Sequence, residues 1–257
     1  MAEEATSGRY RELAPPPEVR AHVLCGWTLD AGRPRDDAVL PDGCMDIVWR
    51  DGHGLIAAGP DTGPAPVSRR PGSTVVGVRF RPGAGAAMLG LPASELRDLR
   101  VPLAELWDED AERLEERLHD AGSPSERLEV LQRELQCRLA RADRPDPMVA
   151  AAVMRLYSND PGLVRALADA LGIGERQLRR RFHAAVGYGP KTLARILRFQ
   201  RLLALASRIG WARGDLARLA LDAGYADQAH MTAEVTRLAG KPPTRLLATR
   251  PAITAGI

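Results

Sequence analysis

The first 83 residues alternate short apolar runs with clusters of turn-forming residues. The runs are rich in Val, Ile, Trp and Phe and lie at residues 23–29, 45–50, 55–58 and 75–81. Gly, Pro and Asp separate them, which is the pattern of short β-strands joined by turns. In the second run, Met45, Ile47 and Trp49 share one strand face because side chains alternate along a strand. The pattern predicts a β-rich domain built as a small barrel or sandwich.

The pattern becomes helical from Ala84 onward. Residues 110–119 and 125–140 lack internal Gly and Pro, and both are expected helices. In the second, a stripe of leucines recurs at steps of three and four; its members are Leu128, Leu131, Leu135 and Leu139. The stripe is either a dimer helix or a cover over the domain's own sheet. Residues 144–147 then break the chain, because each proline there disfavours helix in the residue before it. We therefore predict two domains, residues 1–144 and 145–257.

The second half contains two similar helical units. In the first, Leu167, Ala168 and Leu171 form an apolar face, and Gly172 ends that helix. A new helix begins near Gly174. A helix, a glycine-containing turn and a second helix make a helix-turn-helix. In the second helix, Leu178 and Phe182 point inward, and the outward positions are Arg176, Gln177, Arg179, Arg180 and Arg181. Arginine grips guanine edges and neutralises phosphates, so these residues are candidates to bind double-stranded DNA.

The second unit repeats this order of features. An apolar face at residues 216–223 ends at Gly224, Tyr225 fills the turn, and Asp227 is the expected N-cap of a helix reaching about residue 238. In that helix Met231 and Val235 point inward. Its exposed face offers Gln228, His230, Thr232 and Arg237. A helix over residues 190–207 joins the units and would hold them about 34 Å apart, the spacing of successive major grooves. The whole chain is expected to be an α+β protein with an all-α C-terminal domain.

Charge and composition support this division. Residues 145–257 hold 17 basic and 8 acidic residues, whereas residues 1–144 hold 19 and 25. A basic half joined to an acidic half indicates an anionic partner for the basic half. No apolar run approaches the roughly 18–20 residues of a membrane helix, and no secretory signal opens the sequence. We therefore expect a cytoplasmic protein without membrane contact. Three cysteines without C-x-x-C spacing argue against a disulfide framework or a zinc ribbon.

Residues 163–247 resemble the DNA-binding domain of the AraC/XylS family of bacterial transcription regulators. The motifs that carry the resemblance are ADALG at 168–172, QLRRRF at 177–182, GYGP at 187–190, Arg198, ALDAGYADQAH at 220–230 and GKPP at 240–243. The resemblance implies seven helices and two helices that read the major groove. It places base-reading positions of the first unit at Arg176, Arg179 and Arg180. Those of the second unit fall at Gln228, Ala229, His230 and Ala233.

Some positions depart from the family's pattern. Gly174 stands where members often have Ser, and Met231 and Val235 where they often have Phe. Glycine is an acceptable cap and methionine an adaptable core residue, so the fold is not in question. The side chains of Ala229 and Ala233 donate no hydrogen bond, and Glu234 is expected to place negative charge near the DNA backbone. We therefore predict that the second unit reads less sequence than the first.

The first half also resembles a known domain. Its segments LPDGCMDIV at 40–48 and GVRFRPG at 77–83 resemble the N-terminal domain of many actinobacterial regulators of this type. By analogy, a β-rich, cupin-like domain in this position binds a small effector, dimerises, or does both. Candidate residues for an effector pocket are Trp27, Cys44, Asp46, Trp49, Arg79 and Arg81. Arg79 and Arg81 share a strand face and, if they point inward, would suit a carboxylate or another anion.

Two other functions are alternatives to this interpretation. One is a thiol, electrophile or metal sensor using Cys25 and Cys44 with His22 and His53, although their spacing matches no standard metal site. The other is an enzyme fused to a DNA-binding module, but the chain lacks a G-x-S-x-G elbow, a phosphate loop and an H-E-x-x-H motif. We expect no enzymatic activity, no metal and no cofactor. RNA polymerase and a second copy of the chain are further candidate partners.

Overall fold

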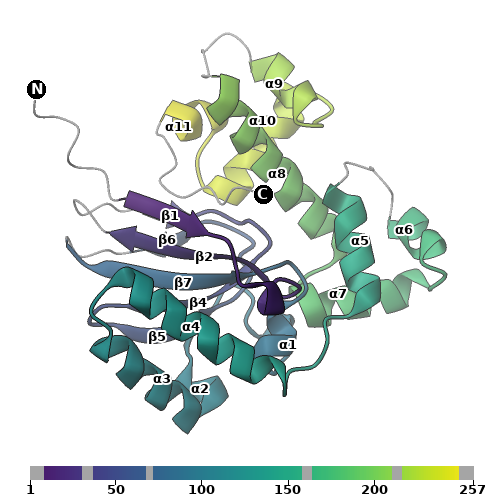
Figure 1. The fold of residues 1–257 in the computed structure, drawn as a ribbon. Helices are drawn as coiled ribbons and strands as arrows, with labels where there is room; N and C mark the ends of the chain where they lie inside the picture. Colours follow the sequence, from purple (N-terminus) through teal and green to yellow (C-terminus); the bar gives the residue numbers. More distant parts are fainter. Residues whose placement is uncertain (1–8, 31–36, 68–71, 158–163, 210–215, 249–257) are drawn as a thin grey trace, which may run out of the picture.

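The computed structural model describes residues 9–30, 37–67, 72–157, 164–209 and 216–248 (Figure 1). Its strands are β1 (Arg9–Leu13), β2 (Val23–Asp30), β3 (Asp37–Val39), β4 (Met45–Arg50), β5 (Gly54–Ala58), β6 (Ala65–Val67), β7 (Thr74–Phe80) and β8 (Arg100–Pro102). The six-stranded main sheet has the antiparallel order β1-β2-β7-β4-β5-β8, and β3 pairs with β6 in a second sheet. The main sheet is open, with β1 and β8 at its edges, so the arrangement is closer to a sandwich than to a closed barrel.

Both faces of the main sheet are covered, which explains the near-continuous apolar runs in β4 and β7. Ile47 and Trp49 of β4 join Val78 of β7 in a core on one face. Val48 and Val75, which alternate with them, belong to a smaller core on the other face. Because successive side chains along a strand point to opposite faces, neighbouring residues of one strand enter different cores. The expected strands are confirmed within one or two residues at each end.

Four helices follow on one face of the sheet: α1 (Gly85–Leu89), α2 (Ala104–Trp107), α3 (Glu109–Asp120) and α4 (Pro124–Leu139). Helix α4 lies across the sheet (Figure 1). Its residues Leu128, Leu131 and Leu135 are at most 2% exposed and pack in the sheet's core, while Leu139 is partly buried against it. The leucine stripe thus covers the protein's own sheet, and the dimer-helix interpretation of this stripe is wrong.

The described residues after position 146 form seven helices, the number that the resemblance implied. They are α5 (Pro147–Tyr157), α6 (Val164–Ala170), α7 (Glu175–Val186), α8 (Pro190–Ile209), α9 (Leu216–Asp222), α10 (Gln228–Ala239) and α11 (Pro243–Ala248). Helix α8 runs between the two helix-turn-helix units (Figure 1). Phe182, Phe199 and Met231, from α7, α8 and α10, are fully buried in their common core. None of the described helices is both long and apolar enough to cross a membrane.

The β-rich part and the helical part are in direct contact. Leu40, which precedes β4, is buried in the core of the C-terminal helices. Gly187, at the end of α7, has a φ of 91°, and a Cβ there would lie 2.6 Å from the ring of Pro60 and 3.1 Å from the carbonyl oxygen of Ala93. Glycine is required at this position because it permits both the left-handed backbone and the close approach. The first helix-turn-helix unit is therefore packed against the sheet domain.

Candidate nucleic-acid interface and ligand pocket

Helix α7 presents arginines to solvent from a firmly anchored backbone. Leu178, Phe182 and Val186 are at most 1% exposed and fix its inner face. Their spacing turns Arg176 and Arg180 outward, where neither makes a hydrogen bond or ion pair within the described part of the chain. A helix held by its apolar face with free cationic side chains opposite has the form of a major-groove reader.

Two further arginines of α7 have intramolecular partners. Arg179 lies 3.1 Å from Glu175, but both side chains are exposed, so this surface pair is weak and can exchange for another anion. Arg181 is turned the other way, and its Nη1 lies 2.6 Å from the carboxylate of Asp146. The same carboxylate accepts a hydrogen bond from the backbone N–H of Met148 at the start of α5. Arg181 therefore ties α7 to α5, whereas the sequence predicts it among the DNA contacts.

Helix α10 presents a more apolar surface than α7. Asp227 caps it as expected, accepting a hydrogen bond of 2.7 Å from the backbone N–H of His230. The residues of its outer face line a shallow groove and are Gln228, Ala229, Thr232, Ala233, Thr236 and Arg237. The hydroxyls of Thr232 and Thr236 donate to backbone carbonyl oxygens one turn earlier, which leaves them only acceptor capacity. Gln228 and Arg237 are the strong donors of this face.

Glu234, whose negative charge the sequence predicts near the DNA backbone, is buried and paired with an arginine of α8. It is 7% exposed, and its carboxylate lies 2.8 Å from Nε of Arg195 on α8. The imidazole of His230 lies 3.5 Å from the same carboxylate and packs edge-on against the ring of Tyr225. One turn of helix separates Glu234 from His230, so both project toward α8. His230 is thereby held in the turn, with less freedom to reach a base than Gln228.

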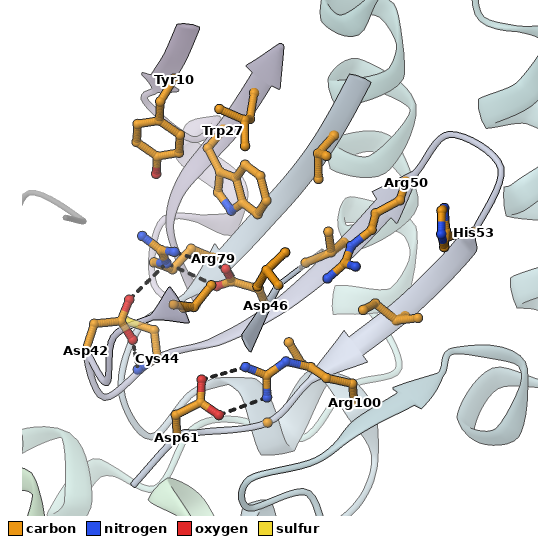
Figure 2. A pocket seen from close by; sticks show the side chains of 18 of the residues that line it. Tyr10, Trp27, Asp42, Cys44, Asp46, Arg50, His53, Asp61, Arg79 and Arg100 are labelled. Carbon is orange, nitrogen blue, oxygen red and sulfur yellow. Dashed lines mark hydrogen bonds and ion pairs between the residues drawn. The ribbon is translucent and has the colours of Figure 1, made fainter. Parts of the chain in front are cut away.

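A pocket of about 80 Å³ lies on the face of the main sheet opposite α4, between that sheet and the β3–β6 pair (Figure 2). Its apolar walls come from alternate residues of several strands. These are Trp27 and Leu29 of β2, Val48 of β4, Ile56 and Ala58 of β5, Val75 of β7, Val39 of β3 and Val67 of β6. On a scale where one water needs about 10–15 Å³, the pocket has room for about five to eight heavy atoms.

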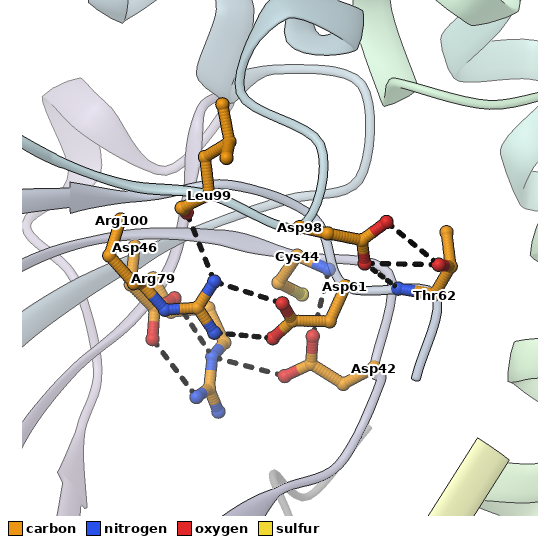
Figure 3. Close-up of polar contacts among 9 residues, drawn as sticks. All are labelled: Asp42, Cys44, Asp46, Asp61, Thr62, Arg79, Asp98, Leu99 and Arg100. Atoms are coloured by element: carbon orange, nitrogen blue, oxygen red, sulfur yellow. Dashed lines mark hydrogen bonds and ion pairs between the residues drawn. The ribbon is translucent and has the colours of Figure 1, made fainter. Parts of the chain in front are cut away.

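Arg79 and two aspartates form a buried ion network at one end of the pocket (Figure 3). Arg79 of β7 is 3% exposed and donates two hydrogen bonds of 3.1 Å to the carboxylate of its cross-strand neighbour Asp46. Its Nε also lies 3.3 Å from Asp42, whose other oxygen accepts from the backbone N–H of Cys44. Burial raises the pKa of the Asp46 carboxyl, and the guanidinium of Arg79 offsets only part of that rise.

A second ion pair closes the neighbouring wall. Arg100 of β8 binds the carboxylate of Asp61 through both terminal nitrogens, at 2.9 and 2.6 Å (Figure 3). Asp61 is 8% exposed, and burial raises its pKa although the hydrogen bonds from Arg100 lower it. Asp98, which has a φ of 61°, accepts hydrogen bonds from the backbone N–H and hydroxyl of Thr62 and holds the adjoining loop. Arg79 and Arg100 thus both already have carboxylate partners in the pocket wall.

Residues 167–249 match the family described as a helix-turn-helix domain. The C-terminal domain is an AraC-type helix-turn-helix domain. The protein is therefore a DNA-binding transcription regulator. Residues 11–102 match a domain of unknown function, DUF6597. No curated protein is similar enough in sequence to match.

Among solved structures, the chain is similar to ToxT from Vibrio cholerae. An apo ToxT variant shares 11% identity with a TM-score of 0.46, over 94% of this chain and 96% of ToxT. A second ToxT structure shares 11% identity with a TM-score of 0.45, over 97% and 100% of the two chains. Wild-type ToxT bound to an unsaturated fatty acid shares 9% identity with a TM-score of 0.44 over the full length of both.

Four of the six residues predicted for an effector pocket of this regulator line the observed pocket: Trp27, Cys44, Asp46 and Arg79. Trp49 does not. It lies three residues after Asp46 on β4, so its side chain points to the opposite face of the sheet. There it is buried, and Arg127 stacks on its ring at 4.6 Å. Arg81 also points elsewhere, because it follows the end of β7 and its Nε donates to the carbonyl oxygen of Arg20.

Sequence reasoning missed several residues that shape the pocket. Asp42 and Asp61 belong to the Gly, Pro and Asp clusters between the predicted strands, and Arg100 lies on a short strand that the apolar pattern does not reveal. The one local sign of these residues is that each aspartate lies in a turn next to a strand. Which arginine it meets cannot be read locally, because that depends on which strands pair. Arg100 and Asp61, for example, are 39 positions apart in the sequence and meet only in the folded protein.

The proposed sensor residues are not brought together. Cys25 and Cys44 are free and buried, and Cys137 is free and exposed. Burial raises the pKa of the Cys25 thiol to about 12 and that of Cys44 well above its usual value, which suppresses the reactive thiolate. Within the described ranges, no group of three or more His, Cys, Asp or Glu side chains could hold a metal ion. Nothing in this geometry favours the thiol- or metal-sensor alternative.

Proposed function

We propose that this regulator contacts double-stranded DNA mainly through α7 and uses α10 as a weaker second contact. One observation carries this proposal: Arg176, Arg179 and Arg180 project from one exposed face of a helix whose opposite face is locked in the core. Arginine can bind guanine O6 and N7 with two hydrogen bonds, which gives direct sequence reading. Arg181 is left out of the proposed interface because of its ion pair with Asp146.

On α10, Gln228 and Arg237 are the proposed polar contacts, and His230 and Thr232 are secondary ones. Ala229 and Ala233 can touch a thymine methyl group but cannot form hydrogen bonds with base edges. Helix α8, which is about 30 Å long at 1.5 Å per residue, holds α10 relative to α7. This division of labour supports α7 as the main reader and α10 as a positioning clamp.

The experiment begins with selection of binding sites from a random duplex library by the full-length protein. Arg180→Ala should then weaken binding to the selected site by about 1–3 kcal/mol and relax specificity at one position. Arg237→Ala should weaken binding to all sequences more evenly and reduce the salt dependence, as loss of a phosphate contact does. Arg133→Ala on α4 is the matched control, since it removes an equal charge from an exposed arginine far from α7.

The outcome that contradicts the proposal is equal loss on selected and random DNA for every α7 arginine variant. Equal loss of specificity on mutating α7 and α10 would instead overturn the division between reader and clamp.

We also propose that residues 1–144 bind a small effector in the pocket and that residues 145–257 form the DNA-binding unit. The pocket supports this because it is concave, mostly apolar and provided with a few convergent polar groups, as ligand sites usually are. The regulator would act in the cytoplasm, with RNA polymerase as a partner and a second copy of the chain on neighbouring DNA. Thermal stabilisation of the full-length chain by one member of a metabolite panel, lost in Arg79→Met, tests the effector site.

A further inference from the structure

Two buried hydrogen-bond donors face the pocket without an acceptor. Trp27 is 7% exposed and Arg79 is 3% exposed, yet Nε1 of Trp27 and Nη1 of Arg79 have no hydrogen-bond partner among the described residues. Figure 2 shows the indole nitrogen of Trp27 directed toward Arg79 and Asp46. A buried donor without an acceptor is unfavourable, because it has lost its hydrogen bond to water and gained none in return. The arrangement is therefore prepared for an oxygen atom supplied by a ligand.

The position of the indole is built into the sheet. Trp27 on β2 lies opposite Gly77 on β7, and a Cβ on Gly77 would lie only 2.4 Å from the indole ring. The ring therefore lies over the bare backbone of Gly77 on the pocket side of the sheet. Arg79 lies two residues further along the same face of β7, so the two donors are diagonal neighbours across paired strands.

The charges around these donors exclude most anions. Arg79 is already within 4 Å of three carboxylates, with its nearest distances 3.1 Å to Asp46, 3.3 Å to Asp42 and 3.9 Å to Glu12. Two further arginines line the pocket: Arg100 is paired with Asp61, and Arg50 lies away from Arg79, toward the end of the pocket where His53 lies (Figure 2). A carboxylate ligand would bring a fourth acidic group to one buried guanidinium. An ammonium ligand would offer no acceptor to either donor and would place a cation beside Arg79.

From these observations we propose that the pocket binds a neutral small molecule with an apolar body and a carbonyl-type oxygen, in preference to a carboxylate or an amine. The oxygen accepts from Nε1 of Trp27 and Nη1 of Arg79, and the apolar body lies against Val48, Ile56 and Val75. This inference rests on the proposed function of the pocket as an effector site. It replaces the anion that the sequence suggested for Arg79.

The test uses three probes with the same four-carbon chain: butanamide, butanoate and butylamine. Each is titrated at equal concentration and neutral pH into ¹⁵N-labelled full-length protein. The readout is the indole N–H signal of Trp27, which is identified by its absence in Trp27→Phe. Butanamide should shift this signal and bind about tenfold more tightly than butanoate, a difference of about 1.4 kcal/mol. Butylamine should not shift it.

Two variants separate this prediction from general loss of folding. Gly77→Ala should displace the indole and abolish the butanamide response, whereas Gly63→Ala should not, because a Cβ at Gly63 meets nothing within 4 Å. Asp42→Asn removes one carboxylate near Arg79 and should improve butanoate binding relative to butanamide. A variant that fails to fold cannot produce that gain in affinity.

Each remaining outcome is decisive. Preferential binding of butanoate or butylamine at Trp27 overturns the neutral-ligand class but keeps the pocket as an effector site. Absence of any shift at Trp27 with all three probes overturns both.

The segment at residues 40–44 lies between the pocket and the helical core. One side of this segment belongs to the pocket, where Asp42 and Cys44 form part of the wall. The other side belongs to the helical core: Leu40 is buried there, and the carbonyl oxygen of Pro41 accepts a buried hydrogen bond of 2.6 Å from Gln200 of α8. A single five-residue segment thus contacts both the ligand pocket and the helix that joins the two DNA-binding units.

Gly43 makes this double contact tight. Its φ is 87°, and a Cβ there would lie 2.8 Å from the side chain of Leu193 on α8. A shift of Asp42 caused by a ligand at Arg79 must therefore be transmitted to α8 or relieved by breaking the contact with Gln200. We infer that residues 40–44 couple pocket occupancy to the placement of α8, and hence to DNA affinity.

A double-mutant cycle tests this coupling, with affinity for a DNA site selected from a random library as the readout. Asp42→Asn should change DNA affinity at least severalfold in the wild-type background and leave it unchanged when Gln200→Met is also present. Asp51→Asn, which alters another pocket-lining aspartate outside the segment, is the matched control and should have no effect. Gly43→Ala replaces Gln200→Met if the latter does not fold. Additive effects, or no effect of Asp42→Asn, would overturn the inference.

Discussion

Replacement of Arg79 by methionine tests the energetic role of the buried ion network. Arg79→Met keeps most of the side-chain length but removes the positive charge that faces Asp46 and Asp42. Removal of one partner of a buried ion pair typically destabilises a protein by about 3–5 kcal/mol, because the other partner is left as an uncompensated charge. Arg79 is 3% exposed, so solvent screens little of this effect. We therefore expect a loss of about 3–5 kcal/mol in the free energy of unfolding at pH 7.

The loss should depend on pH in a defined direction. Burial already raises the pKa of Asp46, and without Arg79 that pKa must rise further. A carboxyl whose folded-state pKa exceeds its unfolded value of about 3.9 stabilises the fold below that value, and this stabilisation disappears as pH rises through the folded pKa. The variant should therefore recover part of its stability between pH 7 and pH 5.

Urea denaturation of the full-length chain, followed by tryptophan fluorescence at pH 5 and pH 7, measures both effects. The matched control adds Asp42→Asn and Asp46→Asn to Arg79→Met, which removes the orphaned charges and should restore much of the loss. A loss below about 1 kcal/mol, or an equal loss at both pH values, would refute the assignment of this network as a tightly coupled buried charge cluster.

Three further predictions follow from the packing. Leu131→Ala should lower the free energy of unfolding by about 2–5 kcal/mol, measured by urea denaturation, without changing the oligomeric state; a change of oligomeric state at constant stability would restore the dimer-helix interpretation. A thiol reagent should modify Cys137 in the folded protein but reach Cys25 and Cys44 only on unfolding, because burial raises the pKa of both; a change of DNA affinity on modification would favour a thiol sensor. Gly187→Ala should lower the free energy of unfolding by about 1–3 kcal/mol, which is detected as a lower melting temperature. An unchanged melting temperature would contradict the tight contact with the sheet domain.

The sequence was most informative where structure depends on local periodicity. The spacing of Leu178 and Phe182, the glycine at position 172 and the cap at Asp227 correctly predicted the helix-turn-helix units and their buried faces. These features depend on residues within one or two helical turns of each other. The motifs from residue 168 to residue 243 added the family, which the match to a helix-turn-helix domain supports.

The roles of individual charged residues were harder to predict. Arg181 and Arg180 are neighbours in an arginine run, yet only Arg181 meets Asp146, which lies 35 positions earlier. Glu234 appeared exposed on a helix face, but α8 packs over it and supplies its arginine partner. In both cases the deciding contact joins separate helices, so no local pattern contains it.

By itself the sequence determined four of the eight described strands (β2, β4, β5 and β7), helices α3 and α4, the two helix-turn-helix units and the basic character of the C-terminal half. Four of the six residues that it suggested for an effector pocket line the observed cavity. Only the tertiary structure decided that Trp49 and Asp46 occupy opposite faces, that Arg79 is already neutralised by aspartates, and that residues 40–44 contact both the pocket and α8. The physical reason is that periodicity is a property of neighbouring residues, whereas ion pairing and packing depend on which distant segments meet.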